Sequence, residues 1–223
     1  MGRVATRVTG PRTDRTTADP TSGPGAAGPP SGVPDRELLD RARQGDERAF
    51  RLLVESYEGR VASVVTAMLG AGDEAEDVGQ ETFIQFYRSL DRFRGEAALG
   101  TYLTRIAINL SRNALRRGRR EAARFESRDD PAFRGTEIAI GAGEAAVGTD
   151  EEVERRERAR RVRRAIDRLD GRHRAVVALR MIEGYSTRET AAILEIPEGT
   201  VLSRLSRAMK KLEIELGLEE RDG

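Results

Sequence analysis

Apolar side chains recur at every third or fourth position through most of the sequence between residues 35 and 216. This spacing places them on one side of an α-helix, which turns about 100° per residue. The stretch 77–90 is a clear case, because one stripe holds Phe83, Phe86, Tyr87 and Leu90. No stretch shows the sustained two-residue alternation of a half-buried strand. The pattern therefore predicts an all-α fold.

In the first half of the chain, the pattern predicts amphipathic helices separated by glycines. Asp35 and Asp46 stand where a side chain can cap a helix N-terminus. The helix after Asp46 carries one apolar stripe, formed first by Phe50, Leu53, Val54 and Tyr57. A later helix over residues 101–117 is expected to bury Leu103, Ile106, Ala107 and Leu110. Gly95 and Gly100 are expected to bracket a short loop before this helix.

In the second half, the pattern predicts a helix-turn-helix. A helix from about residue 151 turns three apolar side chains inward, namely Val162, Ile166 and Leu169. Ser186 and Glu189 have the spacing of a capping box, which marks the start of a short helix. A turn ending at Gly199 follows, and the last major helix opens at Thr200.

Glycine and proline content divides the chain into five parts. The segment 1–33 is rich in both residues and lacks an apolar period, so we expect a disordered arm. A second segment of this kind, 121–150, is expected to be a flexible linker. The predicted organisation is then two small helical domains, at 34–120 and 151–216, with a short tail at 217–223.

Composition excludes several classes of site. The chain has no cysteine and one histidine, so disulfides, thiol nucleophiles and Cys/His metal sites are excluded. We expect no metal, no cofactor and no enzymatic activity, and we interpret His173 as a surface residue. No apolar run approaches the roughly 20 residues of a membrane span. We therefore expect a cytoplasmic protein that does not insert into a membrane.

Charge is segregated along the chain although the net charge is only +1. Residues 72–87 hold five acids and no base, and the outer face of this helix carries Asp77, Gln80 and Glu81. Residues 104–120 hold six arginines and no acid. The outer face of the helix over residues 101–117 combines an aromatic ring, an amide and guanidinium groups, and such a face can bind phosphates and unstacked bases. A solvated charged face is the alternative.

The last major helix has the features of a DNA-recognition helix. Its inner face is apolar, whereas its outer face has hydroxyl groups near the N-terminal end and then cations, formed by Thr200, Ser203, Arg204, Arg207 and Lys210. Such side chains can contact phosphates and base edges in a major groove. We therefore predict that this helix binds duplex DNA.

Three motifs in this order resemble those of bacterial RNA polymerase sigma factors of the extracytoplasmic-function family, close to its sigma-E-like branch. DVGQETFIQFYRSLDRFRGE at residues 77–96 and TYLTRIAIN at residues 101–109 resemble the family's region two. IPEGTVLSRLSRA at residues 196–208 resembles its region four. The resemblance covers about residues 35–216 and implies a region-two helical bundle followed by a region-four helix-turn-helix.

The resemblance implies roles for individual residues. Asp77, Gln80 and Glu81 match positions that bind the beta-prime clamp helices of core polymerase, and the beta flap is implied as a further contact. Residues that match the minus-ten reader, or that would hold adjoining phosphates, are Arg94, Tyr102, Arg105, Asn109, Arg112, Arg116, Arg119 and Arg120. Tyr102 replaces a usual tryptophan. The minus-thirty-five reader is matched by Thr200, Ser203, Arg204, Arg207 and Lys210.

Two positions depart from the family pattern, because Leu202 and Met209 replace usual basic residues. Weaker minus-thirty-five binding and an apolar contact with another protein are both open consequences.

The resemblance thus implies a sigma factor that binds core RNA polymerase, recognises promoter DNA and helps to melt the minus-ten element. It also implies control by an anti-sigma factor. The main alternative is a stand-alone helix-turn-helix regulator whose N-terminal helices dimerise. An enzyme that uses the carboxylates near Asp77 is disfavoured, because these acids are spread along a helix and the chain has one histidine and no cysteine.

Overall fold

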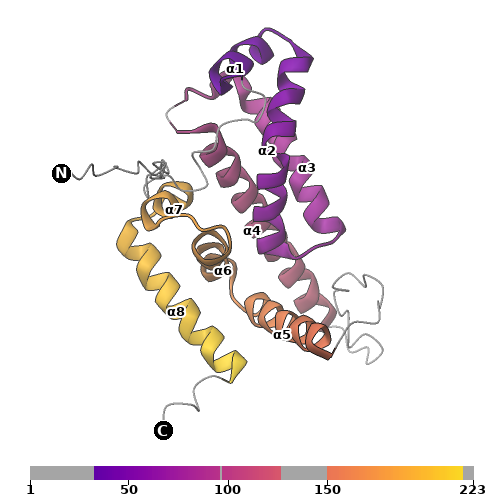
Figure 1. Cartoon of the computed structure of the whole chain (residues 1–223), viewed down its shortest axis with the longest axis vertical. Coiled ribbons are helices and arrows are strands. Elements are labelled where there is room, and N and C mark those ends of the chain that lie inside the picture. Colours follow the sequence, from indigo (N-terminus) through magenta and orange to yellow (C-terminus); the bar gives the residue numbers. More distant parts are fainter. Residues whose placement is uncertain (1–32, 96, 127–149, 218–223) are drawn as a thin grey trace, which may run out of the picture.

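The computed structural model describes residues 33–95, 97–126 and 150–217, and the described residues form helices and no strand, which confirms the all-α prediction. Figure 1 shows their arrangement. In chain order the elements are α1 (Asp35–Arg43), α2 (Glu47–Leu69), α3 (Asp73–Ser89), the short 3-10 helix η2 (Leu90–Arg92), α4 (Leu99–Glu126), α5 (Asp150–Asp167), α6 (Gly171–Val177), the π-helical turn η4 (Ala178–Ile182), α7 (Thr187–Leu194) and α8 (Glu198–Leu216).

Most of the predicted helix starts are confirmed by their capping bonds. The Asp46 carboxylate accepts from the backbone N–H groups of Arg48 and Ala49, and Ser186 and Glu189 form the reciprocal capping box. Asp35 is an exception, because the residue preceding α1 is Pro34 and no side chain caps this helix. The Asp35 carboxylate instead accepts a hydrogen bond of 2.5 Å from the Tyr57 hydroxyl, which ties α1 to α2.

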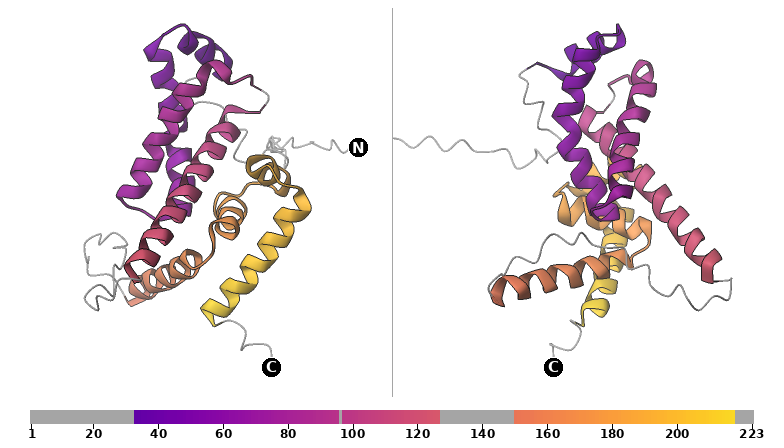
Figure 2. Two further views of the ribbon diagram at one scale, coloured as in Figure 1. Left: turned by 180° about the vertical axis from the view of Figure 1, so that it is seen from behind. Right: turned by 90° about the vertical axis from the view of Figure 1, so that its right-hand side faces the viewer.

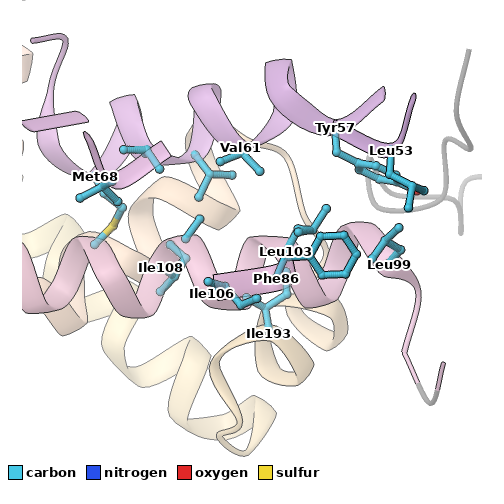
Figure 3. Packing of buried hydrophobic residues seen from close by; sticks show 14 of the residues in the cluster. Leu53, Tyr57, Val61, Met68, Phe86, Leu99, Leu103, Ile106, Ile108 and Ile193 are labelled. Atoms are coloured by element: carbon cyan, nitrogen blue, oxygen red, sulfur yellow. The ribbon is translucent and has the colours of Figure 1, made fainter. Parts of the chain in front are cut away.

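The first half forms a bundle in which α2 and α4 face each other across a shared core, with α3 packed against both. Figure 3 shows Leu53, Tyr57, Val61 and Met68 of α2 opposite Leu99, Leu103, Ile106 and Ile108 of α4. Fully buried aliphatic side chains each stabilise the fold by about 1.5–3 kcal/mol. This interface therefore supplies much of the stability of the first half.

The buried face of α3 differs from the predicted stripe. Ala75, Val78, Thr82 and Phe86 are buried, whereas Tyr87 is 59% exposed and Phe83 is half-buried. The Tyr87 ring lies at the edge of the core, where it packs edge-on against Phe50 with ring centroids 4.9 Å apart. Its phenol therefore stays in solvent while one side of the ring contacts the bundle.

The loop between α3 and α4 is shorter than predicted. Gly95 has a φ of 73°, which glycine adopts readily, but Gly100 lies within the first turn of α4. A Cβ at Gly100 would lie 2.0 Å from a guanidinium nitrogen of Arg60 and 3.2 Å from the Tyr57 ring. Gly100 therefore allows close packing of α4 on α2 and does not end the loop.

The C-terminal helices pack against the first half, as the two views of Figure 2 show together with Figure 1. The core of the first half extends into Leu179, Tyr185 and Ile193 of the second half. A second apolar cluster joins α5 and α6 to α8 through Ala165, Ile166, Leu169, Val177, Ala208 and Leu212. Val162 was predicted to face inward but is exposed, since the cluster begins one turn later on α5.

Parts of the predicted organisation lie outside the described residues. These are the arm up to residue 32, residues 127–149 of the predicted linker and residues 218–223 of the tail. The predicted linker was partly wrong at its edges, because α4 continues through residues 121–126 and α5 begins at Asp150.

Candidate nucleic-acid interface and polymerase-binding face

The outer face of α8 carries the residues that the sequence predicted for DNA recognition. Val201, Ala208 and Leu212 are buried on the inner side of this helix. Ser203, Arg207 and Lys210 are exposed, and Thr200 and Arg204 are half-buried. The preceding turn is tight, with Glu195 at a left-handed φ of 54° and the Ile196 N–H bonded to the Ala191 carbonyl at 3.1 Å. α7, this turn and α8 therefore form a helix-turn-helix.

The two departures from the family pattern have different surroundings. Met209 is partly buried against the apolar cluster of α5 and α8, so it contributes to packing. Leu202 is 55% exposed. A basic residue is thus missing at Leu202 from the open surface of α8, whereas Met209 fills space inside the domain.

The residues predicted to bind the minus-ten element differ in solvent exposure. Arg94, Asn109, Arg116, Arg119 and Arg120 are exposed, whereas Tyr102, Arg105 and Arg112 are half-buried. They lie on α4, apart from Arg94 in the preceding loop.

Tyr102 belongs to an aromatic group beneath this loop. Its ring centroid lies 4.8 Å from that of Phe93 and 6.3 Å from that of Phe86. The Tyr102 hydroxyl donates to Ser89 Oγ at 2.9 Å. One side of the ring is therefore occupied by protein, which limits the area on which a base can stack.

Two of the predicted DNA-binding arginines contact the second half of the chain. Arg105 donates to the Glu195 carboxylate at 2.7 Å and to the Ala192 carbonyl at 2.8 Å, both at the end of α7. Arg119 donates to the Leu169 carbonyl at 2.8 Å. The side of α4 that carries these cations is thus turned toward the C-terminal helices.

A basic cleft lies between α4, the start of α6 and the first turns of α8. Its volume is about 540 Å³. The cations that line it come from all three elements and are Arg112, Arg116, Arg119, Arg172, Arg204 and Arg207. The structure therefore brings together residues that the sequence assigned to two separate DNA-binding surfaces.

Electrostatics within the cleft are dominated by positive charge. Burial lowers the pKa of Arg112, and the nearby Arg172, Arg116 and Arg204 lower it further. Asp170 also lines the cleft and caps α6. Burial alone would raise the pKa of Asp170, but hydrogen bonds from the His173 ring and from the backbone N–H groups of His173 and Arg172 lower it to about 2.

The face of α3 predicted to bind polymerase is open to solvent. Asp77 and Gln80 are exposed and Glu81 is half-buried. Glu81 forms an ion pair with Arg88 of the same helix at 3.7 Å. Because both side chains are substantially exposed, this pair contributes at most about 1 kcal/mol and a binding partner can displace it.

Sequence analysis missed the residues at the junction of α6 with the first half. His173 was interpreted as a surface residue but is partly buried, with its Nδ1 2.5 Å from Asp170 Oδ2. Arg174 is only 3% exposed and donates to the Met68 carbonyl at 2.9 Å. A signal was present in the sequence, because Asp170 stands where its side chain can cap a helix that begins at Gly171.

Within residues 33–95, 97–126 and 150–217, no three histidine or acidic side chains lie close enough to hold a metal ion together. None of the helices in these ranges combines the length and the apolar character that crossing a membrane requires.

Two family models match the chain, Sigma-70 region 2 over residues 53–121 and Sigma-70, region 4 over residues 159–212. The ECF RNA polymerase sigma-E factor of Escherichia coli (strain K12) is 39% identical over 181 residues, which cover 80% of this chain and 92% of that protein. The RNA polymerase sigma-H factor of Pseudomonas aeruginosa is 37% identical over 183 residues, with the same coverage of 80% and 92%.

Solved structures share the fold. CnrH, solved in complex with the cytosolic domain of CnrY, has a TM-score of 0.56 and 28% identity, and the match covers 85% of this chain and 99% of CnrH. The sigma factor RpoE from Bartonella quintana, solved with the anti-sigma factor NepR, has a TM-score of 0.53 over 77% of this chain and 98% of RpoE. Its identity of 23% supports the fold alone. Family models, sequence identity and fold together show that this chain belongs to the extracytoplasmic-function sigma factors of bacterial RNA polymerase.

Proposed function

We propose that this sigma factor divides promoter recognition between α8 and α4 and binds core polymerase through α3. α8 binds minus-thirty-five duplex DNA through Thr200, Ser203, Arg204, Arg207 and Lys210. α4 and its preceding loop capture the minus-ten strand. The observation that carries the proposal is the segregation of charge, since the outer faces of α4 and α8 are basic and the first turns of α3 carry acids without a base. The protein works in the bacterial cytoplasm, where polymerase and the chromosome meet.

The free energy cost of opening the promoter is too large for this protein alone, so polymerase must take part. Each base-pair step that is opened costs about 1.4 kcal/mol of stacking. A flipped base that stacks on one aromatic ring returns roughly 1–3 kcal/mol. Tyr102 alone therefore cannot offset the melting of several steps, and core polymerase must hold the strands apart.

Promoter binding also requires the two halves to separate. Arg105 is bound to α7, and Arg112 and Arg204 line one cleft of about 540 Å³. A DNA duplex, whose major groove alone is about 12 Å wide, does not fit into such a volume. The arrangement described here is then a closed form, in which parts of the two DNA-binding surfaces line one cleft.

An apolar groove on another face suits an anti-sigma factor, the kind of partner bound by the related RpoE from Bartonella quintana. The groove has a volume of about 800 Å³ and lies between α2, α5 and η4, with Ala62, Val162 and Ile182 in its lining. Its rim carries Arg155, Arg158 and Arg163. We propose that an amphipathic helix of the partner docks here, with its apolar stripe in the groove and acids against the arginines.

The division of labour is tested with two charge reversals in the full chain. Glu81→Arg is expected to weaken core-polymerase binding about tenfold and to leave minus-thirty-five DNA binding unchanged. Arg204→Glu is expected to weaken minus-thirty-five DNA binding about tenfold and to leave core-polymerase binding unchanged. Gln85→Arg adds a cation to an exposed position of the same helix α3 and serves as the control. If Glu81→Arg binds polymerase as tightly as the unmodified protein, Glu81 does not belong to the interface.

A further inference from the structure

Six guanidinium groups converge on the cleft between α4, α6 and α8, although these elements are far apart in the sequence. Figure 2 shows α4 and α8 on either side of the segment that contains α6. Convergence of like charges costs free energy, because each cation repels the others at reduced dielectric. A closed form that gathers these arginines therefore calls for a compensating negative charge.

The acid that lines the cleft does not provide this compensation. Asp170 Oδ1 accepts from the backbone N–H groups of Arg172 and His173 at 2.9 and 3.1 Å, and its Oδ2 lies 2.5 Å from the His173 ring. Lys211 is a further cation, 4.0 Å from the same carboxylate. The charge of Asp170 is thus committed to the cap of α6, and the six arginines remain in excess.

One of the residues that line the cleft has a buried hydrogen-bonding atom without a partner. His173 lines it, and His173 Nε2 is buried without a hydrogen-bond partner among the described residues. Buried polar atoms are nearly always paired, so such an atom requires an explanation. Thr200 and Ser203 add two hydroxyl groups to the lining. The cleft therefore offers hydroxyl groups beside its cations, and rotation of the His173 ring could add its unpaired nitrogen.

The size and chemistry of the cleft select the class of ligand. About 540 Å³ lies within the range of roughly 300–1,000 Å³ that small-molecule sites occupy. Guanidinium groups match the paired oxygens of phosphate, and several of them match an anion that carries several phosphates. We propose that this cleft binds a small polyphosphate anion, of the class of a nucleoside polyphosphate, which bridges the two halves and holds the sigma factor closed.

Anion binding would regulate promoter binding, because the two ligands share arginines of the cleft. Arg112, Arg116, Arg204 and Arg207 serve both the anion and, under the proposed function, promoter DNA. A bound anion would then compete with the promoter, since it neutralises these cations and keeps α4 and α8 together. This consequence rests on the proposed function, whereas anion binding itself does not and is measured without DNA or polymerase.

Calorimetric titration of the full chain with inorganic tripolyphosphate, at constant ionic strength, tests the site. One ion is expected to bind per chain. Arg112→Ala on α4 and Arg204→Ala on α8 are each expected to weaken binding at least about tenfold, because each removes a charged hydrogen-bond donor. Arg204→Lys, which keeps the charge, should restore part of the affinity. The control is Arg36→Ala on α1, which removes an exposed arginine outside the cleft.

Several results would overturn the proposal. These are the absence of saturable binding to the unmodified chain, unchanged affinity in both cleft variants, or an equal loss in the Arg36→Ala control. Binding of a duplex oligonucleotide, but not of tripolyphosphate, would assign these arginines to DNA alone. Circular dichroism checks that the variants are folded, and Arg204→Lys supplies a second test should Arg204→Ala unfold. Failure of anion binding would leave polymerase-dependent transcription untouched, so the two proposals are distinguishable.

Discussion

Buried charged residues join the two halves of the molecule at the scale of single side chains. Arg174 of α6 donates to the Met68 carbonyl at the end of α2 and to the Asp167 carbonyl, and its guanidinium lies 3.2 Å from Asp167 Oδ1. Burial lowers the pKa of Arg174 to about 10, and the Asp167 carboxylate opposes this effect. Arg174 therefore stays charged at neutral pH and satisfies carbonyls from both sides of the junction.

Arg174→Met is expected to lower the free energy of unfolding by about 2–4 kcal/mol, because it leaves buried carbonyl groups without a donor. Urea denaturation followed by circular dichroism measures the change. Arg164→Met on α5 is the control, since that arginine is exposed and should cost less than about 0.5 kcal/mol. A loss for Arg174→Met as small as that of the control would contradict this role.

The lowered pKa of Asp170 makes the free energy of unfolding depend on pH. Its pKa is about 2 in the folded protein and about 3.9 in an unfolded chain, so its stabilising effect is present above about pH 4 and is lost as the pH falls toward 2. The side chain is 40% exposed, so we expect an effect of about 1 kcal/mol after discounting for solvent screening. Asp170→Asn keeps a capping oxygen and removes the charge. The free energy of unfolding is measured by urea denaturation for Asp170→Asn and for the unmodified protein, and the difference between them should disappear between pH 4 and pH 2. A difference that stays constant over this range would show that the charge of the carboxylate is not the cause.

At the scale of elements, α4 is the helix on which both halves of the molecule meet. It packs against α2 and α3 on one side and against α6 and α7 on the other. Thr104 is buried on the second side, where its hydroxyl lies 3.2 Å from that of Tyr185. Ser111 is also buried and donates to the Ala107 carbonyl of the preceding turn. α4 is therefore both a core helix and the support of the proposed minus-ten surface.

Sequence pattern predicts such elements better than it predicts their contacts. The 3.6-residue period located α4 and α8, and hydrogen-bonding side chains located the caps at Asp46 and Ser186. The second buried face of α4 was not predictable, because Thr104 and Ser111 are polar and Thr104 is covered by Tyr185, which lies 81 residues later in the chain. For the same reason, the sequence assigned Arg105 to DNA and did not reveal its contact with Glu195.

Asn109→Ala on α4 is expected to reduce promoter opening about tenfold or more while core-polymerase binding changes less than about twofold, because under the proposed function this exposed amide binds a flipped base of the minus-ten strand and does not contact polymerase. Permanganate footprinting of the open complex and a polymerase-binding assay measure the two effects. Glu121→Ala, at an exposed position further along the same helix and outside the proposed minus-ten residues, is the control. An equal loss of both activities would exclude the proposed contact with a flipped base.

At the scale of the whole molecule, a small set of polar contacts supplements the apolar core across the two halves. Ser63 of α2 donates to Glu183 at 2.7 Å, and Arg163 of α5 donates to the carbonyls of Thr66 and Ala67. Contacts between exposed polar groups are worth about 1 kcal/mol or less each. These exposed contacts are therefore a minor part of the junction, beside the shared apolar core and buried Arg174. Under the proposed function, polymerase and promoter together must offset all of these contacts when the closed form opens.

Ser63→Glu places two carboxylates opposite each other and is expected to shift the equilibrium toward the open form by about 0.5–1 kcal/mol. The chain has no cysteine, so spin labels at Glu55→Cys and Glu213→Cys report the distance between α2 and α8 without interference. The long-distance population should increase about two- to fivefold, and Gln85→Glu, which changes charge away from the contact, should leave it unchanged. An unchanged distance distribution in Ser63→Glu would show that this contact does not hold the halves together.

Promoter-dependent transcription in a purified system tests the central claim most directly. The full chain, bacterial core polymerase and a library of its host's promoter fragments are combined, and the transcripts are sequenced. We expect discrete start sites that require both proteins, with transcription lost in Glu81→Arg and Arg204→Glu and kept in Gln85→Arg. Absence of any promoter-dependent transcript, together with a footprint of the chain alone on a palindromic duplex, would contradict the account and favour a stand-alone helix-turn-helix regulator.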